Sequence, residues 1–197
     1  ELNFNEKDGF KSLYEKGGGL ISSSNEILIL AGSTFGGGST VNWSACLKTP
    51  FKVRKEWYDE FNIEWAATEA FDQCLDFVWK LMGATTENIK HSFSNQVLLD
   101  GSQKLGHPHR ELAQNTGGHP NHSCGFCYLG CKHSVKQGSS EFWFREASLN
   151  GSKFMEEVQV KKILHEDGKA TGVLCEDAVS KRRFTISGPK KIVVAGG

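Results

Sequence analysis

The sequence predicts an α/β domain in which helices accompany a mostly parallel sheet and a β-meander. Between residues 68 and 82, apolar side chains recur at helical spacing: Phe71, Cys74, Leu75, Val78, Leu81 and Met82. From residue 157 to 186 the apolar period changes to two, which is typical of strands. Residues 191–194 form a continuous apolar run, as in a buried parallel strand. Together these patterns favour the α/β class.

The first half of the chain alternates short elements with turns. Thr68 is the expected N-cap of the helix over 68–82, and Gly83 is its expected end. Ser94 is the expected cap of a helix that runs through Leu99 and ends near Gly101. The remaining expectations are a helix end at 10–15 stopped by glycines, a hairpin of 20–21 with 27–30, and a helical turn or two at 54–61.

The second half begins with a long irregular segment over residues 106–138, which is rich in histidine, cysteine and glycine. Loops of such length are usually functional or disordered. A helix is expected from Ser139 to Leu149. Strands are expected over residues 158–163, 170–175 and 184–186, with a turn at 166–168.

Composition sets broad limits on function. The 197 residues can bury a core as one domain, and we treat residues 1–197 as a single partial domain. Lys and Arg number 23, as do Asp and Glu, so nothing in the charge favours nucleic acid or an anionic membrane. No stretch reaches the roughly 18 apolar residues that a membrane-spanning helix needs.

A glycine-rich segment follows the apolar run 27–31. It reads Gly32-Ser-Thr-Phe-Gly36-Gly37-Gly38-Ser39-Thr-Val-Asn42. Consecutive glycines let the backbone approach a ligand closely and adopt positive φ. The Asn42 amide can donate and accept hydrogen bonds at once. The segment therefore predicts a ligand-contacting turn, and a flexible glycine loop is the alternative interpretation.

This segment resembles a flavin-contacting motif of the glucose–methanol–choline (GMC) oxidoreductases. Its continuation over residues 41–50 is similar to the long-chain fatty alcohol oxidase branch of yeasts and plants. The resemblance extends to residues 124–131, 136–138 and 192–196, in the order that the family shows. It covers most of the chain and implies an interior fragment of the FAD-binding domain, without the upstream Gly-x-Gly-x-x-Gly unit and without the C-terminal substrate domain.

The resemblance also implies which residues contact the cofactor. Gly36, Gly37 and Gly38 match glycines whose backbone approaches the flavin and diphosphate region. Ser39 matches a position near the phosphates or the isoalloxazine edge, and Asn42 matches an asparagine that hydrogen-bonds near the flavin. Later in the chain, Val160 matches a residue whose backbone meets the adenine, and Ala195 and Gly196 match a turn near the ADP portion. An inward-facing core valine is the alternative for Val160.

The chemistry implied by the resemblance is FAD-dependent oxidation of a long-chain primary alcohol, with O2 reduced to hydrogen peroxide. No catalytic residue is assigned, because the family's catalytic histidine is expected beyond Gly197. Sterols, sugars or choline remain alternative substrates. Trp43 stands where many relatives have a small residue, and we interpret it as a wall of an apolar substrate tunnel.

Cys124, Cys127 and Cys131 have metal-ligand spacing, and His119, His122 and His133 lie nearby. A zinc-binding interaction module is therefore an alternative from another class, and a Cys-x-x-Cys disulfide is a third. The family resemblance favours a structural or site-bordering loop without metal.

Cys46, Cys74 and Cys175 are expected to be buried thiols, as in a reducing intracellular compartment. Relatives imply a peroxisomal or membrane-associated location, and the oligomeric state is open.

Overall fold

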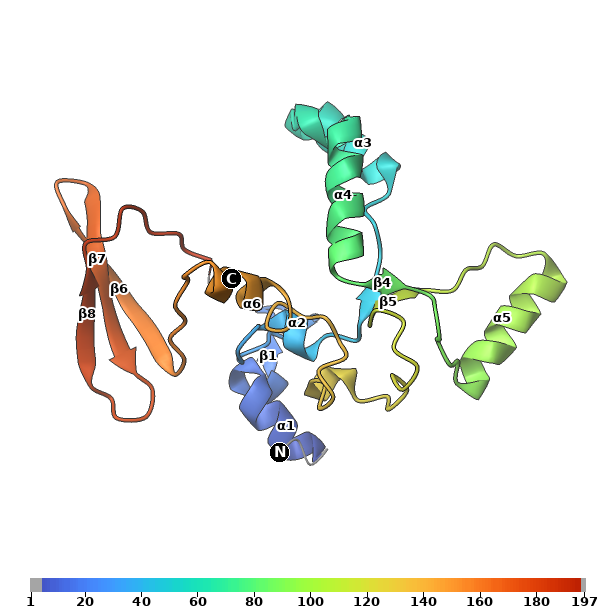
Figure 1. Cartoon of the computed structure of the whole chain (residues 1–197), viewed down its shortest axis with the longest axis horizontal. Coiled ribbons are helices and arrows are strands. Elements are labelled where there is room, and N and C mark those ends of the chain that lie inside the picture. The colour runs from blue at the N-terminus through green and yellow to red at the C-terminus, as the bar shows by residue number, and fades with distance from the viewer. Residues whose placement is uncertain (1–4, 196–197) are drawn as a thin grey trace. The chain divides into compact units, whose positions relative to one another are not determined.

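The computed structural model describes residues 5–195, which divide into two compact units. The first unit spans Glu1–Asn150 and the second spans Gly151–Gly197. Figure 1 labels most of their helices and strands, which are numbered in chain order.

The first unit begins with α1 (Glu6–Leu13), which Asn5 caps: its Oδ1 accepts hydrogen bonds from the Lys7 and Asp8 amides at 3.1 and 3.4 Å. A short 3-10 turn, η1 (Glu15–Gly18), leads into β1 (Leu20–Ile21) and β2 (Leu28–Ile29). These strands pair antiparallel, so the predicted hairpin is confirmed.

The first unit also contains a small three-stranded antiparallel sheet. Its strands are β3 (Ala45–Cys46), β5 (Ala113–Asn115) and β4 (Ala84–Thr85), in the order β3-β5-β4. Strand β5 falls inside the segment predicted to be an irregular loop. The sheet therefore joins chain segments that are far apart in sequence.

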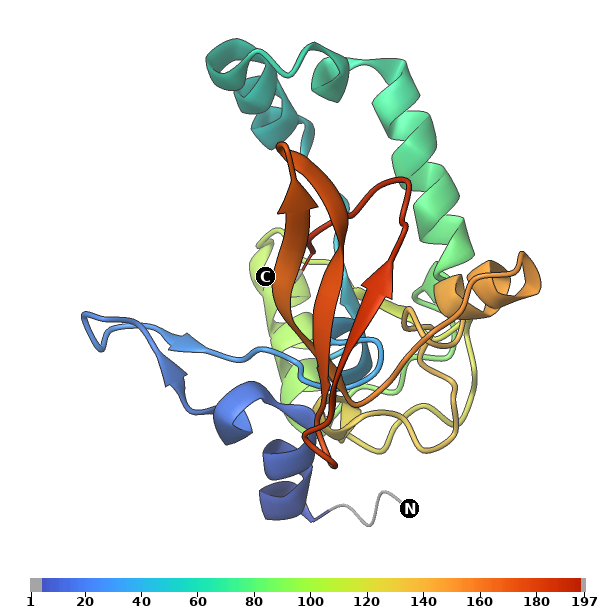
Figure 2. The ribbon, with the colours of Figure 1, turned by 90° about the vertical axis from the view of Figure 1, so that its left-hand side faces the viewer.

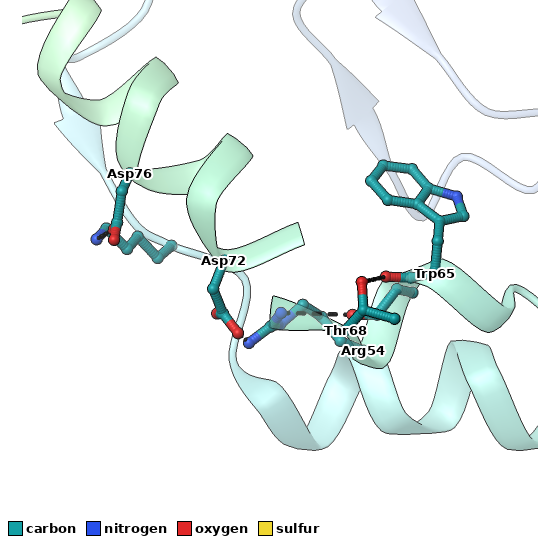
Figure 3. A network of polar contacts seen from close by, with 7 residues as sticks. Arg54, Trp65, Thr68, Asp72 and Asp76 are labelled. Atoms are coloured by element: carbon teal, nitrogen blue, oxygen red, sulfur yellow. Dashed lines mark hydrogen bonds and ion pairs between the residues drawn. The ribbon is translucent and has the colours of Figure 1, made fainter. Parts of the chain in front are cut away.

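Two helices flank a 3-10 turn in the middle of the chain: α3 (Phe51–Phe61), η2 (Glu64–Ala67) and α4 (Glu69–Leu81). Arg54 holds them together, since its side chain is buried and donates to Asp72 Oδ1 at 2.6 Å and to the Ala66 carbonyl at 3.4 Å (Figure 3). The helix predicted over 68–82 is confirmed, although the Thr68 hydroxyl donates to the Trp65 carbonyl instead of capping α4.

Helix α5 (Phe93–Leu105) is longer than predicted at both ends. Ser92 rather than Ser94 caps it, accepting from the Asn95 amide at 3.4 Å. The helix continues through Gly101 and ends at Gly106, which adopts the left-handed conformation at φ 70°. A glycine inside a helix costs only about 1 kcal/mol relative to alanine, so Gly101 does not stop it.

The loop 106–138 also contains a short 3-10 turn, η3 (Cys127–Leu129). Helix α6 (Trp143–Leu149) starts four residues later than predicted. Helix α2 (Gly38–Val41) is a single turn directly after the glycine-rich segment. Among the residues described, no helix has both the length and the apolar character that crossing a membrane demands.

The second unit is a three-stranded meander of β6 (Val158–Glu166), β7 (Lys169–Asp177) and β8 (Arg183–Ser187), shown in orange and red in Figure 2. Each strand pairs antiparallel with the next. Asp167 and Gly168 form the first turn with positive φ values of 48° and 74°. The three predicted strands are confirmed.

The predicted mostly parallel sheet is not found within residues 5–195, where every pair of strands is antiparallel. Residues 191–195 are not in a strand. Parallel strands form only beside a partner that a crossover connection brings alongside, and the described residues supply none for this run. An apolar run indicates that a segment tends to be buried, but it does not show that a partner strand is present beside it.

Candidate functional site: a glycine turn held by a buried lysine

The glycine turn, residues 32–38, connects the first hairpin to α2. Gly36 and Gly37 have φ values of 87° and 53°, and Gly37 combines this φ with ψ −136°. The Gly37 amide donates to the Thr34 carbonyl at 2.7 Å. Residues with a Cβ are strongly disfavoured in such conformations. The backbone path itself therefore requires glycine at positions 36 and 37.

Gly32 is required for a different reason, which is close packing of backbone on backbone. A Cβ at Gly32 would lie 2.5 Å from the Gly37 carbonyl carbon and 2.7 Å from the Gly38 nitrogen. Gly38 is the exception. It has no positive φ, and a Cβ there would meet no described heavy atom within 4 Å. The fold explains three of the four glycines and leaves open space beside the fourth.

The Ser39 side chain fastens the turn to the start of the segment before α6. Its hydroxyl lies 2.7 Å from the Gly36 carbonyl and 2.7 Å from the Ser139 hydroxyl, and it accepts from the Ser139 amide at 2.9 Å. Gly138 permits this approach, because a Cβ there would lie 2.9 Å from the Ser39 carbonyl oxygen. Ser39 thus has a structural role in addition to any ligand contact.

Lys136 is the central side chain of the site, and it is only 3% exposed. Its Nζ donates to the carbonyl oxygens of Thr40, Asn42 and Cys127 at 2.6, 2.9 and 2.7 Å. All three ammonium donors are therefore used. Burial lowers the pKa of Lys136, and the sulfur groups of the nearby cysteines oppose this shift. The lysine ties the backbone after the glycine turn to the cysteine loop, residues 124–131.

Tyr14 adds a second link between the same segments. Its buried hydroxyl lies 2.7 Å from the Tyr128 carbonyl and 3.1 Å from the Val41 carbonyl, and burial raises its pKa. The Tyr14 ring stacks on Phe10 with centroids 4.8 Å apart. Tyr14 thereby links the end of helix α1 to α2 and to η3.

Asn42 directly follows α2, and both of its carbonyl groups are engaged. The side-chain Oδ1 accepts from the Ser44 amide at 3.0 Å, and the backbone oxygen accepts from Lys136. This leaves the amide nitrogen as the donor end of the side chain. The next residue, Trp43, is 58% exposed and stacks on Tyr128 with centroids 6.0 Å apart.

The cysteine loop packs beside these residues. Cys127 Sγ lies 3.3 Å from His122 Nε2 and accepts from the Ser44 hydroxyl at 3.4 Å. Cys131 Sγ accepts from the amides of Val135 and Lys136 at 3.3 and 3.4 Å. Within residues 5–195, no three His, Cys, Asp or Glu side chains are placed to share a metal ion, so no ligand set for the zinc alternative is assembled there.

The structure brings the residues predicted from the first motif together: Gly36, Gly37, Gly38, Ser39 and Asn42. Val160 and Ala195 belong to the second unit. Val160 lies on β6 opposite Cys175 and is 56% exposed, so the described residues do not bury it in a core. Gly196 lies outside the described residues.

Sequence reasoning missed the role of Lys136 and Tyr14, because the carbonyls that they contact belong to distant parts of the chain. Of the three cysteines expected to be buried, Cys46 and Cys175 are buried, whereas Cys74 is exposed. Cys74 lies on α4, a helix without buried residues in the described structure. Its place in the apolar pattern therefore does not lead to burial.

Comparison with known proteins identifies the family. A GMC oxidoreductase family model matches residues 10–197. The long-chain-alcohol oxidases FAO4A and FAO3 of Arabidopsis thaliana are each 38% identical to this chain, over 88% and 85% of its length and 24% and 22% of theirs. An uncharacterized GMC-type oxidoreductase of Mycobacterium tuberculosis is 25% identical over 84% of the chain and 26% of its own length.

The chain therefore belongs to the GMC oxidoreductase family. It spans about a quarter of the length of the curated relatives that it matches. No solved structure gives a significant match. The matched region is the FAD-binding part of this family, and the predicted family is confirmed.

The site has features that suit such a cofactor. The unobstructed surface beside Gly38 allows a ligand to approach the backbone, and the Asn42 amide offers a polar edge next to it. A flavin presents a flat ring with mixed donor and acceptor edges, which matches this combination. The residues present therefore fit FAD.

Proposed function

We propose that the protein oxidises long-chain primary alcohols to aldehydes, with FAD as cofactor and O2 as the electron acceptor that becomes hydrogen peroxide. Membership of the GMC oxidoreductases and the names of the Arabidopsis relatives support this proposal. The observation that carries it in this structure concerns Gly38. Open space lies beside this residue, and the fold itself does not require glycine there.

In this proposal the backbone of Gly36, Gly37, Gly38 and Ser39 and the amide of Asn42 hold the flavin side of the cofactor. Val160, Ala195 and Gly196 hold its ADP portion. When bound, FAD supplies the acceptor for the hydride of the alcohol. The residues of this chain bind and orient it, and Lys136 and Tyr14 hold the backbone that does so.

The proposal places the catalytic base outside residues 1–197 and treats the chain as part of a longer polypeptide. Large apolar side chains that no described residue covers support this, such as Phe93, 87% exposed, and Leu105, 73% exposed. A peroxisomal or membrane-associated location belongs to the proposal as well.

The first test uses the protein purified from its complete reading frame. We expect flavin absorption bands near roughly 380 and 450 nm, and FAD released on denaturation. Peroxide formation should be rapid with dodecanol and should fall steeply toward ethanol. A colourless protein that takes up no flavin would overturn the proposal. Equal turnover of both alcohols would overturn the chain-length preference alone.

A second prediction concerns Trp43, which follows Asn42 in the chain. Its ring is exposed and stacks on Tyr128. Replacing Trp43 by alanine removes an apolar wall, and we expect kcat/KM for dodecanol to fall about tenfold, as for a lost burial contribution of about 1.4 kcal/mol. The value for a short alcohol should change little. Trp65→Ala is a matched control, since Trp65 is an exposed tryptophan outside the glycine turn that packs on Phe71 instead.

A further inference from the structure

Three side chains form a hydrogen-bonded row beside the segment that follows α2: Cys127, His122 and Gln114. Cys127 Sγ lies 3.3 Å from His122 Nε2, and His122 Nδ1 lies 3.3 Å from Gln114 Oε1. The three residues come from η3, the preceding loop and β5. A nucleophile, a base and a group that orients the base are the parts of an activated thiol.

The hydrogen bonds determine the protonation of the imidazole. Gln114 Oε1 can only accept, so His122 Nδ1 carries the ring proton, and Nε2 is the acceptor that faces the thiol. Burial lowers the pKa of His122, and the positive charges of Lys136 and His119 lower it further. His122 is therefore a neutral base at physiological pH.

Two further groups surround the Cys127 residue. The buried Ser44 hydroxyl donates to its sulfur at 3.4 Å, and the Lys136 ammonium group donates to its backbone carbonyl at 2.7 Å. Ser44 can therefore hydrogen-bond negative charge on the sulfur as the thiol proton leaves. Cys127 itself is half-buried, so a small reagent can reach it.

We propose that Cys127 is a peroxide-reactive thiol, with His122 as its base and Gln114 as the residue that positions this base. The sulfur attacks one oxygen of hydrogen peroxide, and the O–O bond breaks. His122 Nε2 takes the thiol proton and passes it to the departing hydroxide, which leaves as water. The products are the Cys127 sulfenic acid and water, with sulfur oxidised and peroxide reduced by two electrons.

The reaction of Cys127 does not depend on alcohol oxidation, because hydrogen peroxide from any source can oxidise the thiol. Its biological consequence rests on the proposed function: an oxidase that releases peroxide would expose this thiol, which contacts Ser44, to its own product. Oxidation of Cys127 would change the sulfur that Ser44 contacts, two residues after Asn42. Oxidation of the thiol by peroxide would therefore alter a contact of the segment that follows α2.

The experiment measures the oxidation of each cysteine in the purified protein with added hydrogen peroxide and dimedone, followed by peptide mass spectrometry. The chain contains its own references. Cys74 is an exposed thiol outside the row, and Cys175 is buried at 1% exposure and reports unfolding when it becomes labelled. Because peroxide is added, the outcome does not depend on whether the protein oxidises alcohols.

We expect Cys127 to be trapped at least about tenfold faster than Cys74, since a positioned base contributes roughly 10²- to 10⁴-fold to proton transfer. His122→Gln should reduce the Cys127 rate to that of Cys74, and Gln114→Leu should reduce it partly, with Cys175 still protected. Labelling of Cys127 no faster than Cys74 in the unaltered protein would refute the proposal. So would preferential labelling of Cys124 or Cys131, or an unchanged Cys127 rate in folded His122→Gln.

Discussion

Replacing Lys136 by methionine is expected to destabilise the first unit by about 3 kcal/mol. Methionine fills a similar volume, but it cannot donate to the carbonyls of Thr40, Asn42 and Cys127. Each buried carbonyl that loses its donor costs roughly 1–3 kcal/mol, and relief from burying the ammonium charge offsets part of this sum. The effect should appear as a lower midpoint of urea denaturation.

Lys52→Met is the matched control, because Lys52 is exposed on α3. A surface substitution of this kind usually changes the free energy of unfolding by less than about 0.5 kcal/mol. A second readout is hydrogen exchange of the amides of residues 40–42, which should accelerate only in Lys136→Met. Equal denaturation midpoints for the two variants would mean that Lys136 does not hold the turn.

The elements that the sequence predicted well are those whose signal is local. Helix α4 follows from a period of 3.6 residues and the β6–β8 meander from a period of two, each interrupted by its own turn residues. The first hairpin likewise lies within ten residues. Such patterns record which side of an element is apolar, and this information is contained in the element itself.

The features that the sequence could not predict depend on distant partners. A lysine between Val135 and Gln137 has no local mark of burial, since its three acceptors come from residues 40, 42 and 127. The same applies to the pairing direction of the sheet and to the exposure of Cys74. The glycine turn was predictable because the glycines that its backbone path requires lie within residues 32–38.

The glycines of the turn allow stability and cofactor binding to be separated experimentally. In Gly32→Ala the new methyl group would lie 2.5 Å from backbone carbon of Gly37, so the turn must open. In Gly37→Ala the backbone is held where φ is 53° and ψ is −136°. Strain of this kind costs about 1–3 kcal/mol. Both variants should lose stability, and any flavin with it.

Gly38→Ala is expected to behave in the opposite way. Its methyl group meets no described atom within 4 Å and lies at the first position of α2, where alanine favours a helix by up to about 1 kcal/mol. The urea midpoint should therefore stay the same or rise. The added methyl group would occupy the space that a flavin needs, and we expect FAD affinity to fall at least about tenfold, or about 1.4 kcal/mol. The measurement is the flavin absorbance per protein chain at increasing FAD concentration. Unchanged FAD affinity in a stable Gly38→Ala variant would mean that the flavin does not contact the open side of Gly38. If the variant instead lost stability together with FAD affinity, Gly38 would be required by the fold.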